Sequence, residues 1–292
     1  SKVKMRRIYC WFALTLPLAV TALIRTRETL AAANQFFFSG GGLGDVEVSS
    51  LVEESFEWTS NLGAPAALVA GAVIATMYEN IRSGDLELLE SDTTGTRMMK
   101  KLTRFLLLSA FALEIMCIFA TTVTGTVLLS RSLDVMDNVQ PISKGSTPLS
   151  FLHGNFEFEY LTARITMLQG LINWLLAIGL NHLLPTPDAP VEMVYLNKFI
   201  AWSLFSCIAL MSSFYNKHMT FYANYFEMLC RWLTVTWDRF FWKFPPRPLA
   251  LIFIPSLSYS AYLGYKAFAH DEVHTFIQKR KRARSDASNH SD

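Results

Sequence analysis

Long apolar blocks with almost no charged residues set the strongest limit on what this chain can fold into. Six such blocks occur along the 292 residues, at positions 8–24, 62–77, 106–129, 165–184, 196–214 and 249–268. Each is close to the roughly 20 residues that a helix needs to cross the hydrocarbon core of a bilayer. Because a globular core is not selected for such long uncharged runs, the distribution indicates membrane-spanning helices.

The overall composition agrees with a lipid environment. Hydrophobic residues make up 51% of the chain and charged residues only 17%, whereas a soluble domain carries about 25% charged residues. The net charge of +2 gives no global field that would attract nucleic acid. The sequence therefore predicts an all-α, polytopic transmembrane helix bundle in an integral membrane protein, with membrane lipids and no nucleic acid among its partners.

We predict about four to six spans from these blocks. The four middle blocks are the strongest, whereas the first carries Pro17 after a basic start and the last carries Pro255 with serines close behind. Before the last block, tryptophans are interleaved with basic residues in a stretch that ends at Pro245. Such a mixture is typical of an amphipathic helix that lies at the membrane interface.

Changes in composition divide the chain into four parts. Residues 1–60 hold the first apolar segment and a glycine-rich, acidic loop, and residues 61–222 hold the core transmembrane bundle. Residues 223–270 combine the aromatic, basic interfacial segment with the last apolar span, and residues 271–292 form a basic, disordered tail. The loop is expected because the acidic residues between positions 45 and 57 follow a glycine run and cannot lie in lipid.

Sequence motifs for catalysis or metal binding are lacking. The chain has no Walker loop, EF-hand loop or His-Glu-x-x-His motif, and its six histidines are scattered. The four cysteines lie in or beside apolar blocks without Cys-x-x-Cys spacing. We therefore expect a protein that is not an enzyme and that has no cofactor and no resident metal.

Polar side chains inside the apolar blocks are the strongest candidates for function. Glu114 lies within the block at 106–129, where a charge is costly, so we expect it to be protonated, paired across helices or exposed to water. Asn173 on the next block is a candidate partner, as are Asn181, His182 and four threonines on the helix of Glu114 itself. We predict Glu114 and Asn173 as intramembrane polar contacts, which either stabilise the bundle or serve an ion or proton.

Small residues and a terminal carboxylate share one face of the block at 62–77. Leu68, Gly71 and Ala75 recur near helical spacing, and Glu79 follows one turn later. Such a slim face is typical of tight helix packing. Alternatively it lines a pore, in which Glu79 from several copies forms an acidic ring that favours cations.

This segment resembles the pore helix of the Orai family, the store-operated calcium channel subunits. The resemblance is carried by Ala-Leu-x-x-Gly ending at Gly71 and by Met-x-Glu ending at Glu79, and it extends weakly over residues 61–222. It implies a hexamer of subunits with four successive spans, in which Glu79 forms the calcium-selectivity ring. It also implies that Leu68 belongs to the hydrophobic section of the pore.

The chain differs from that family in pore residues and in charge. Alanines stand where the family places a basic, an aromatic and a β-branched pore residue, at Ala64, Ala72 and Ala75. The resemblance puts Glu79 on the outer side of the membrane. Five bases between Arg82 and Arg104 instead favour a cytoplasmic position for this end under the positive-inside rule.

The leading hypothesis is a subunit of a homo-oligomeric cation channel, with calcium as the implied permeant ion and Glu79 as its ligand. The alternative is a non-catalytic structural or assembly subunit of a larger membrane complex, whose small-residue and tryptophan-rich faces bind other membrane subunits or lipids. A third hypothesis, a proton-coupled carrier that uses Glu114, ranks last because the chain shows no repeat of broken helices.

Overall fold

The computed structural model describes residues 43–89, 91–130, 147–185, 190–242 and 252–268. Its helices are α2 (Leu43–Ser83), α3 (Thr94–Leu129), α4 (Pro148–Asn155), α5 (Glu157–His182), α6 (Val191–Lys217), α7 (Tyr225–Trp237) and the π-helix η2 (Asp238–Trp242), and residues 252–268 are also helical. No strand occurs in these residues, which confirms the predicted all-α class. The predicted first block and the predicted basic tail lie outside the described residues.

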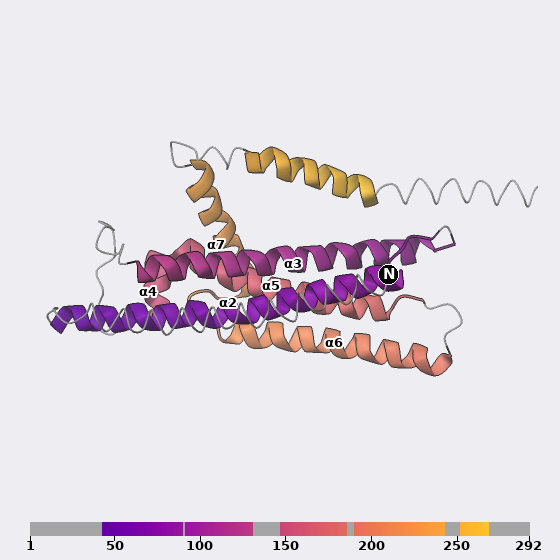
Figure 1. Ribbon diagram of the computed structural model, residues 1–292, viewed down its shortest axis with the longest axis horizontal. Coiled ribbons are helices and arrows are strands. Elements are labelled where there is room, and N and C mark those ends of the chain that lie inside the picture. Colours follow the sequence, from indigo (N-terminus) through magenta and orange to yellow (C-terminus); the bar gives the residue numbers. More distant parts are fainter. Residues whose placement is uncertain (1–42, 90, 131–146, 186–189, 243–251, 269–292) are drawn as a thin grey trace, which may run out of the picture. The chain divides into compact units, whose positions relative to one another are not determined.

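Four of the helices are long and apolar enough to cross a membrane. They comprise Ser50–Ser83, Thr94–Leu129, Glu157–His182 and Val191–Lys217. These segments contain three of the four middle blocks of the sequence and all but the last two residues of the block at 165–184, so the chain has the helices of a multi-pass integral membrane protein, as predicted. α3 and α5 lie side by side along much of their length, and α6 packs on α5 (Figure 1).

The acidic stretch before the first of these spans is helical, so the predicted loop was wrong there. α2 begins at Leu43 and continues through the acidic residues to Ser83. Glutamate forms helices readily, and carboxylates near a helix N-terminus interact favourably with the helix dipole. The chain divides into two compact units, residues 1–53 and 54–292, and all the site residues described below lie in the second.

Side-chain caps fix the points at which three helices begin. Thr93, Thr147 and Asn224 precede α3, α4 and α7, and each accepts a hydrogen bond from the amide three residues later, at 3.3, 3.2 and 2.9 Å. These bonds satisfy amides that the helix itself leaves unpaired. Pro148 follows Thr147 at the start of α4, where a proline costs no helical hydrogen bond.

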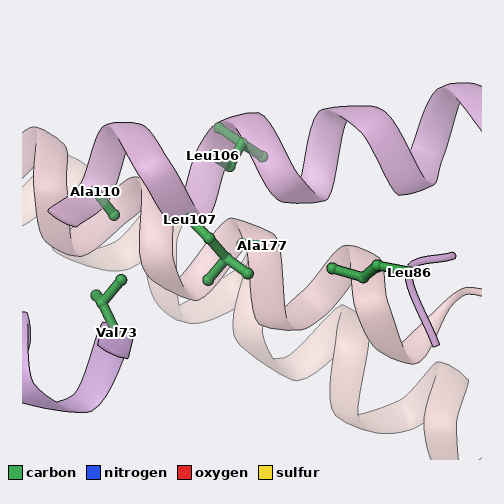
Figure 2. Packing of buried hydrophobic residues seen from close by; sticks show 6 residues of the cluster. All are labelled: Val73, Leu86, Leu106, Leu107, Ala110 and Ala177. Carbon is green, nitrogen blue, oxygen red and sulfur yellow. The ribbon is translucent and has the colours of Figure 1, made fainter. Parts of the chain in front are cut away.

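The core between α2, α3 and α5 consists mainly of small and aliphatic side chains. Figure 2 shows one cluster, formed by Val73, Leu86, Leu106, Leu107, Ala110 and Ala177. A second cluster contains Ala66, Cys117, Ala120 and Ala163. Because lipid tails are as apolar as these side chains, close packing between small residues stabilises such an interface more than removal from water does.

Two glycines of α5 admit side chains from both neighbouring helices. A Cβ atom at Gly170 would lie 2.5 Å from Oε1 of Glu114 on α3. A Cβ atom at Gly179 would lie 2.6 Å from Cε1 of Phe205 on α6. Non-bonded carbon atoms normally keep about 3.5–4.0 Å apart. The glycines therefore allow α5 to approach α3 and α6 closely at these two levels.

A buried lysine holds the connection between α2 and α3. Lys100 Nζ donates to Asp92 Oδ2 and to the Glu87 carbonyl oxygen, both at 2.8 Å, and only 7% of the residue is exposed. Burial alone would raise the pKa of Asp92, but hydrogen bonds from Lys100 and from the Leu89 amide outweigh this effect and hold the pKa below its usual range. Gly84, with φ of 72°, starts the turn in a conformation that favours glycine.

Candidate functional site

Glu114 lies inside the bundle on α3 and faces α5. Its side chain is fully buried (0% exposed), and neither carboxyl oxygen has a hydrogen-bond partner among the described residues. The carboxyl group sits against the bare backbone of Gly170, where any larger side chain would collide with it. In the described part of the chain, Glu114 is thus neither paired across helices nor exposed to water.

Asn173 belongs to a chain of hydrogen bonds that joins three helices. Tyr225 Oη on α7 donates to Gln169 Oε1 at 3.0 Å, and Gln169 Nε2 donates to Asn173 Oδ1 at 2.7 Å. Asn173 Nδ2 then donates to Ser109 Oγ on α3 at 3.0 Å. Burial raises the pKa of Tyr225 to about 12, so its hydroxyl keeps the proton that it donates. Polar groups linked in this way stabilise one another.

Three residues of this hydrogen-bond series, Gln169, Ser109 and Tyr225, were not predicted from the sequence, although one local signal was available. Gln169 precedes Asn173 by four residues, which places the two amides on the same face of α5. The sequence could not identify Ser109 and Tyr225 as their partners, because each lies on another helix. The hydrogen-bond series can therefore be recognised only once α3, α5 and α7 are placed against one another.

Most of the other polar groups that were predicted as partners of Glu114 form hydrogen bonds elsewhere. The hydroxyls of Thr121, Thr124 and Thr126 donate to carbonyl oxygens of their own helix at 2.9, 2.7 and 2.8 Å. Asn181 Nδ2 on α5 donates to Asn80 Oδ1 on α2 at 3.2 Å. These contacts fasten helices and satisfy hydroxyls, and they leave the carboxyl group without a donor.

The predicted pore stripe lies on the face of α2 that the other described helices leave uncovered. Leu68 is 62% exposed, and Ala75 and Glu79 are exposed as well. A Cβ atom added at Gly71 would meet no atom within 4 Å. The opposite face of the helix is buried, and it carries Ala66, Ala70, Val73 and Asn80. We call the uncovered side, defined by Leu68, Gly71, Ala75 and Glu79, the free face of α2.

Glu79 has a basic neighbour on its own helix. Arg82 Nη1 lies 3.9 Å from Glu79 Oε2, and the two side chains are 53% and 64% exposed, respectively. Such an exposed pair is weak, because water screens both charges. The carboxylate of Glu79 is therefore available to other cations, but Arg82 offsets part of its negative charge.

Arg164 is a half-buried cation of α5 that the sequence analysis missed. Its Nε donates to Tyr215 Oη at 3.0 Å, and its Nη1 donates to Tyr160 Oη at 2.5 Å. The guanidinium carbon also lies 5.4 Å from the ring centre of Tyr160 and 5.1 Å from that of Tyr215. Aromatic faces attract such a cation. Arg164 directly precedes the predicted block at 165–184, so it lies outside the apolar blocks in which polar side chains were considered.

Two further arginines bind the acidic start of α5. Arg231 on α7 donates from Nε and Nη2 to the two carboxylate oxygens of Glu157, at 2.7 and 2.9 Å. Arg239 on η2 contacts both carboxylate oxygens of Glu159, at 2.7 and 2.9 Å. Bidentate pairs of this kind fix orientation as well as distance. The predicted aromatic, basic segment is thus a helix that is fastened to α5.

His153 attaches α4 to the turn that precedes α7. Its ring stacks on Phe221 with ring centres 4.4 Å apart, and its Nε2 lies 3.0 Å from Tyr222 Oη. Burial lowers the pKa of His153, although the carboxylate of Glu157 acts in the opposite direction. Burial also raises the pKa of Tyr222 to about 12. The two groups therefore form a neutral contact near pH 7.

Within the described residues, no group of three or more His, Cys, Asp or Glu side chains is placed to hold a metal ion. No family model matches the chain, and neither a curated protein nor a solved structure is significantly similar to it. The Orai resemblance of the α2 segment therefore stays a prediction. Glu114 and Asn173 lie on the adjoining helices α3 and α5, whereas Glu79 lies near the C-terminal end of α2.

Proposed function

We propose that this chain is a non-enzymatic subunit of a homo-oligomeric cation channel and that α2 lines the pore. The observation that carries the proposal is the free face of α2, on which Leu68, Gly71 and Ala75 are not covered by any of the described helices. Several copies can therefore place these faces around a common axis without breaking a contact within any subunit. Small side chains on such a face allow helices to approach closely.

Glu79 is the ion ligand in this proposal. It ends the free face and is exposed, so an oligomer would collect several Glu79 carboxylates in a ring. A ring of carboxylates attracts cations and excludes anions. Calcium as the permeant ion follows from the resemblance to the Orai pore helix, and carboxylate oxygens are ligands that calcium prefers.

The test is cation flux through the purified full chain in liposomes, with Glu79→Gln as the variant. Glu192→Gln is the matched control, because Glu192 is an exposed acid in the first turn of α6 and so lies near the same end of the bundle. We expect calcium flux in the unaltered protein, a loss of calcium selectivity in Glu79→Gln and little change in Glu192→Gln. Flux and selectivity that survive Glu79→Gln would contradict the proposal. The mass in nanodiscs should correspond to several copies of one chain.

A second candidate function is supported by the surface of α6 and by the neighbour of Glu79. α6 buries a single side chain, Ala201, and exposes large residues that include Phe199 and Trp202. Arg82 also reduces the attraction of Glu79 for cations. Both features fit a structural subunit that binds lipids and other membrane subunits through its outer helices. Purification in a fixed ratio with different chains, together with absent flux, would favour this function over the channel.

A further inference from the structure

The surroundings of Glu114 are incompatible with a charged carboxylate. The group is fully buried and accepts no hydrogen bond from any described residue. A buried carboxylate needs a counterion or several donors to offset the loss of hydration. Neither is present, so the packing of α3 against α5 accommodates the neutral acid.

The helices around Glu114 bring no charge to its level. On α5, Gly170 faces the carboxyl group, and the neighbouring Thr166 hydroxyl donates to the carbonyl oxygen of its own helix at 2.7 Å. On α2, Val73 belongs to the cluster that contains Ala110, and Ala66 belongs to the cluster that contains Cys117, so apolar α2 side chains pack on α3 one turn before and one turn after Glu114. The titratable group that interacts with Glu114 from its own helix is Cys117, a buried thiol.

The nearest cation along α5 and the nearest amide are already engaged. Arg164 lies almost two turns before Gly170 and is held by two tyrosine hydroxyls. Asn173 lies one turn after Gly170, and its Nδ2 donates to Ser109. An ionised Glu114 could therefore gain a donor only if Thr166, Cys117 or Asn173 gave up its present hydrogen bond, or if water entered between α3 and α5.

We propose that Glu114 is a proton-binding site and that its proton keeps α3 and α5 closed. The neutral acid fits against Gly170, whereas loss of the proton to water leaves a carboxylate that the closed helices cannot solvate. Deprotonation is therefore coupled to separation of α3 from α5 at this level, which admits water. The proposal does not depend on Glu79 or on conduction, because it concerns a different helix pair and a different ligand.

The first measurement is infrared spectroscopy of the full chain in nanodiscs, which detects the carbonyl stretch of neutral carboxylic acids. We expect the unaltered protein at neutral pH to show this band and Glu114→Gln to lack it. Glu192→Gln is the control, because it removes one carboxyl group from an exposed position outside the helix core and should leave the band unchanged. A spectrum of Glu114→Gln that keeps the band, or an unaltered protein without it, would overturn the proposal.

The second measurement is hydrogen exchange of α3 and α5 as a function of pH, corrected for the intrinsic pH dependence of amide exchange. If opening releases one proton, the population of the open form rises about tenfold per pH unit in the range where opening is observed. Glu114→Gln has the size of the neutral acid and cannot ionise, so its corrected exchange should be slow and independent of pH. Equal pH dependence in both proteins, or none in the unaltered protein, would refute the coupling. An unaltered protein without the neutral-acid band would overturn the proposal even if the variant folds poorly.

Discussion

The substitution Gly170→Ala tests the close contact between α3 and α5. The new Cβ would lie 2.5 Å from Oε1 and 2.9 Å from Cδ of Glu114, and the carboxyl group has no free space because it is fully buried. Overpacking of this kind costs about 1–3 kcal/mol. Alanine is favoured over glycine in a helix by about 1 kcal/mol. We therefore expect a net loss of about 0–2 kcal/mol in the free energy of unfolding.

A double-mutant cycle separates the two contributions. In a Glu114→Ala background the clash is absent, so Gly170→Ala should stabilise the protein by about 1 kcal/mol through helix propensity. The coupling between the two positions should therefore be about 1–3 kcal/mol. Gly264→Ala, in the helix at 252–268 and away from the proposed pore face, is the matched control, since its Cβ would enter open space, and it should be stabilising in both backgrounds. The assay is unfolding in mixed micelles by titration with SDS. The reasoning would be refuted if Gly170→Ala had the same effect with and without Glu114.

Two further predictions concern groups outside the apolar middle of the bundle. Because His153 has a lowered pKa in the folded protein, its contact should contribute stability above about pH 6.5, and this contribution should be lost as the pH falls further. In His153→Gln, the free energy of unfolding should fall less steeply as the pH drops through this range. A slope equal to that of the unaltered protein would contradict the role given to His153. Lys100→Met leaves Asp92 without its buried partner, so the free energy of unfolding should fall by roughly 3 kcal/mol near pH 7. The double variant with Asp92→Leu should recover most of this loss. Because the pKa of Asp92 is also lowered, its contribution to the free energy of unfolding should persist down to about pH 4 and disappear below it. Unfolding of the unaltered protein and of both Lys100 variants, measured from about pH 7 to about pH 3, checks the loss of stability and its pH dependence.

The four spans could be predicted because length and low charge are properties of single segments. The ends of the helices are harder to predict. The acidic residues before position 58 suggest a loop, but in the structure they form the N-terminal part of α2. Charge excludes a segment from lipid, but it doesn't prevent that segment from forming a helix that extends beyond the bilayer. Hydropathy therefore located the lipid-soluble part of each helix and not its ends.

Contacts between helices could not be predicted from single segments. The sequence marks Glu114 and Asn173 alike as costly polar residues in apolar helices. In the structure they differ, because Asn173 both accepts and donates a hydrogen bond, whereas Glu114 has no hydrogen-bond partner among the described residues. The difference depends on the rotation of α5, which turns Gly170 toward the acid. Arg164 was missed because its partners include Tyr215, which lies on α6.

The bond between Tyr225 and Gln169 sets an order for assembly in the membrane. Gln169 and Asn173 lie on α5, which precedes α7 in the chain. Until α7 arrives, the amide oxygen of Gln169 lacks the donor that it has in the folded protein, and an unpaired amide in lipid is unfavourable. The hydrogen-bond network of Gln169 and Asn173 is therefore complete only once α7 has docked on α5.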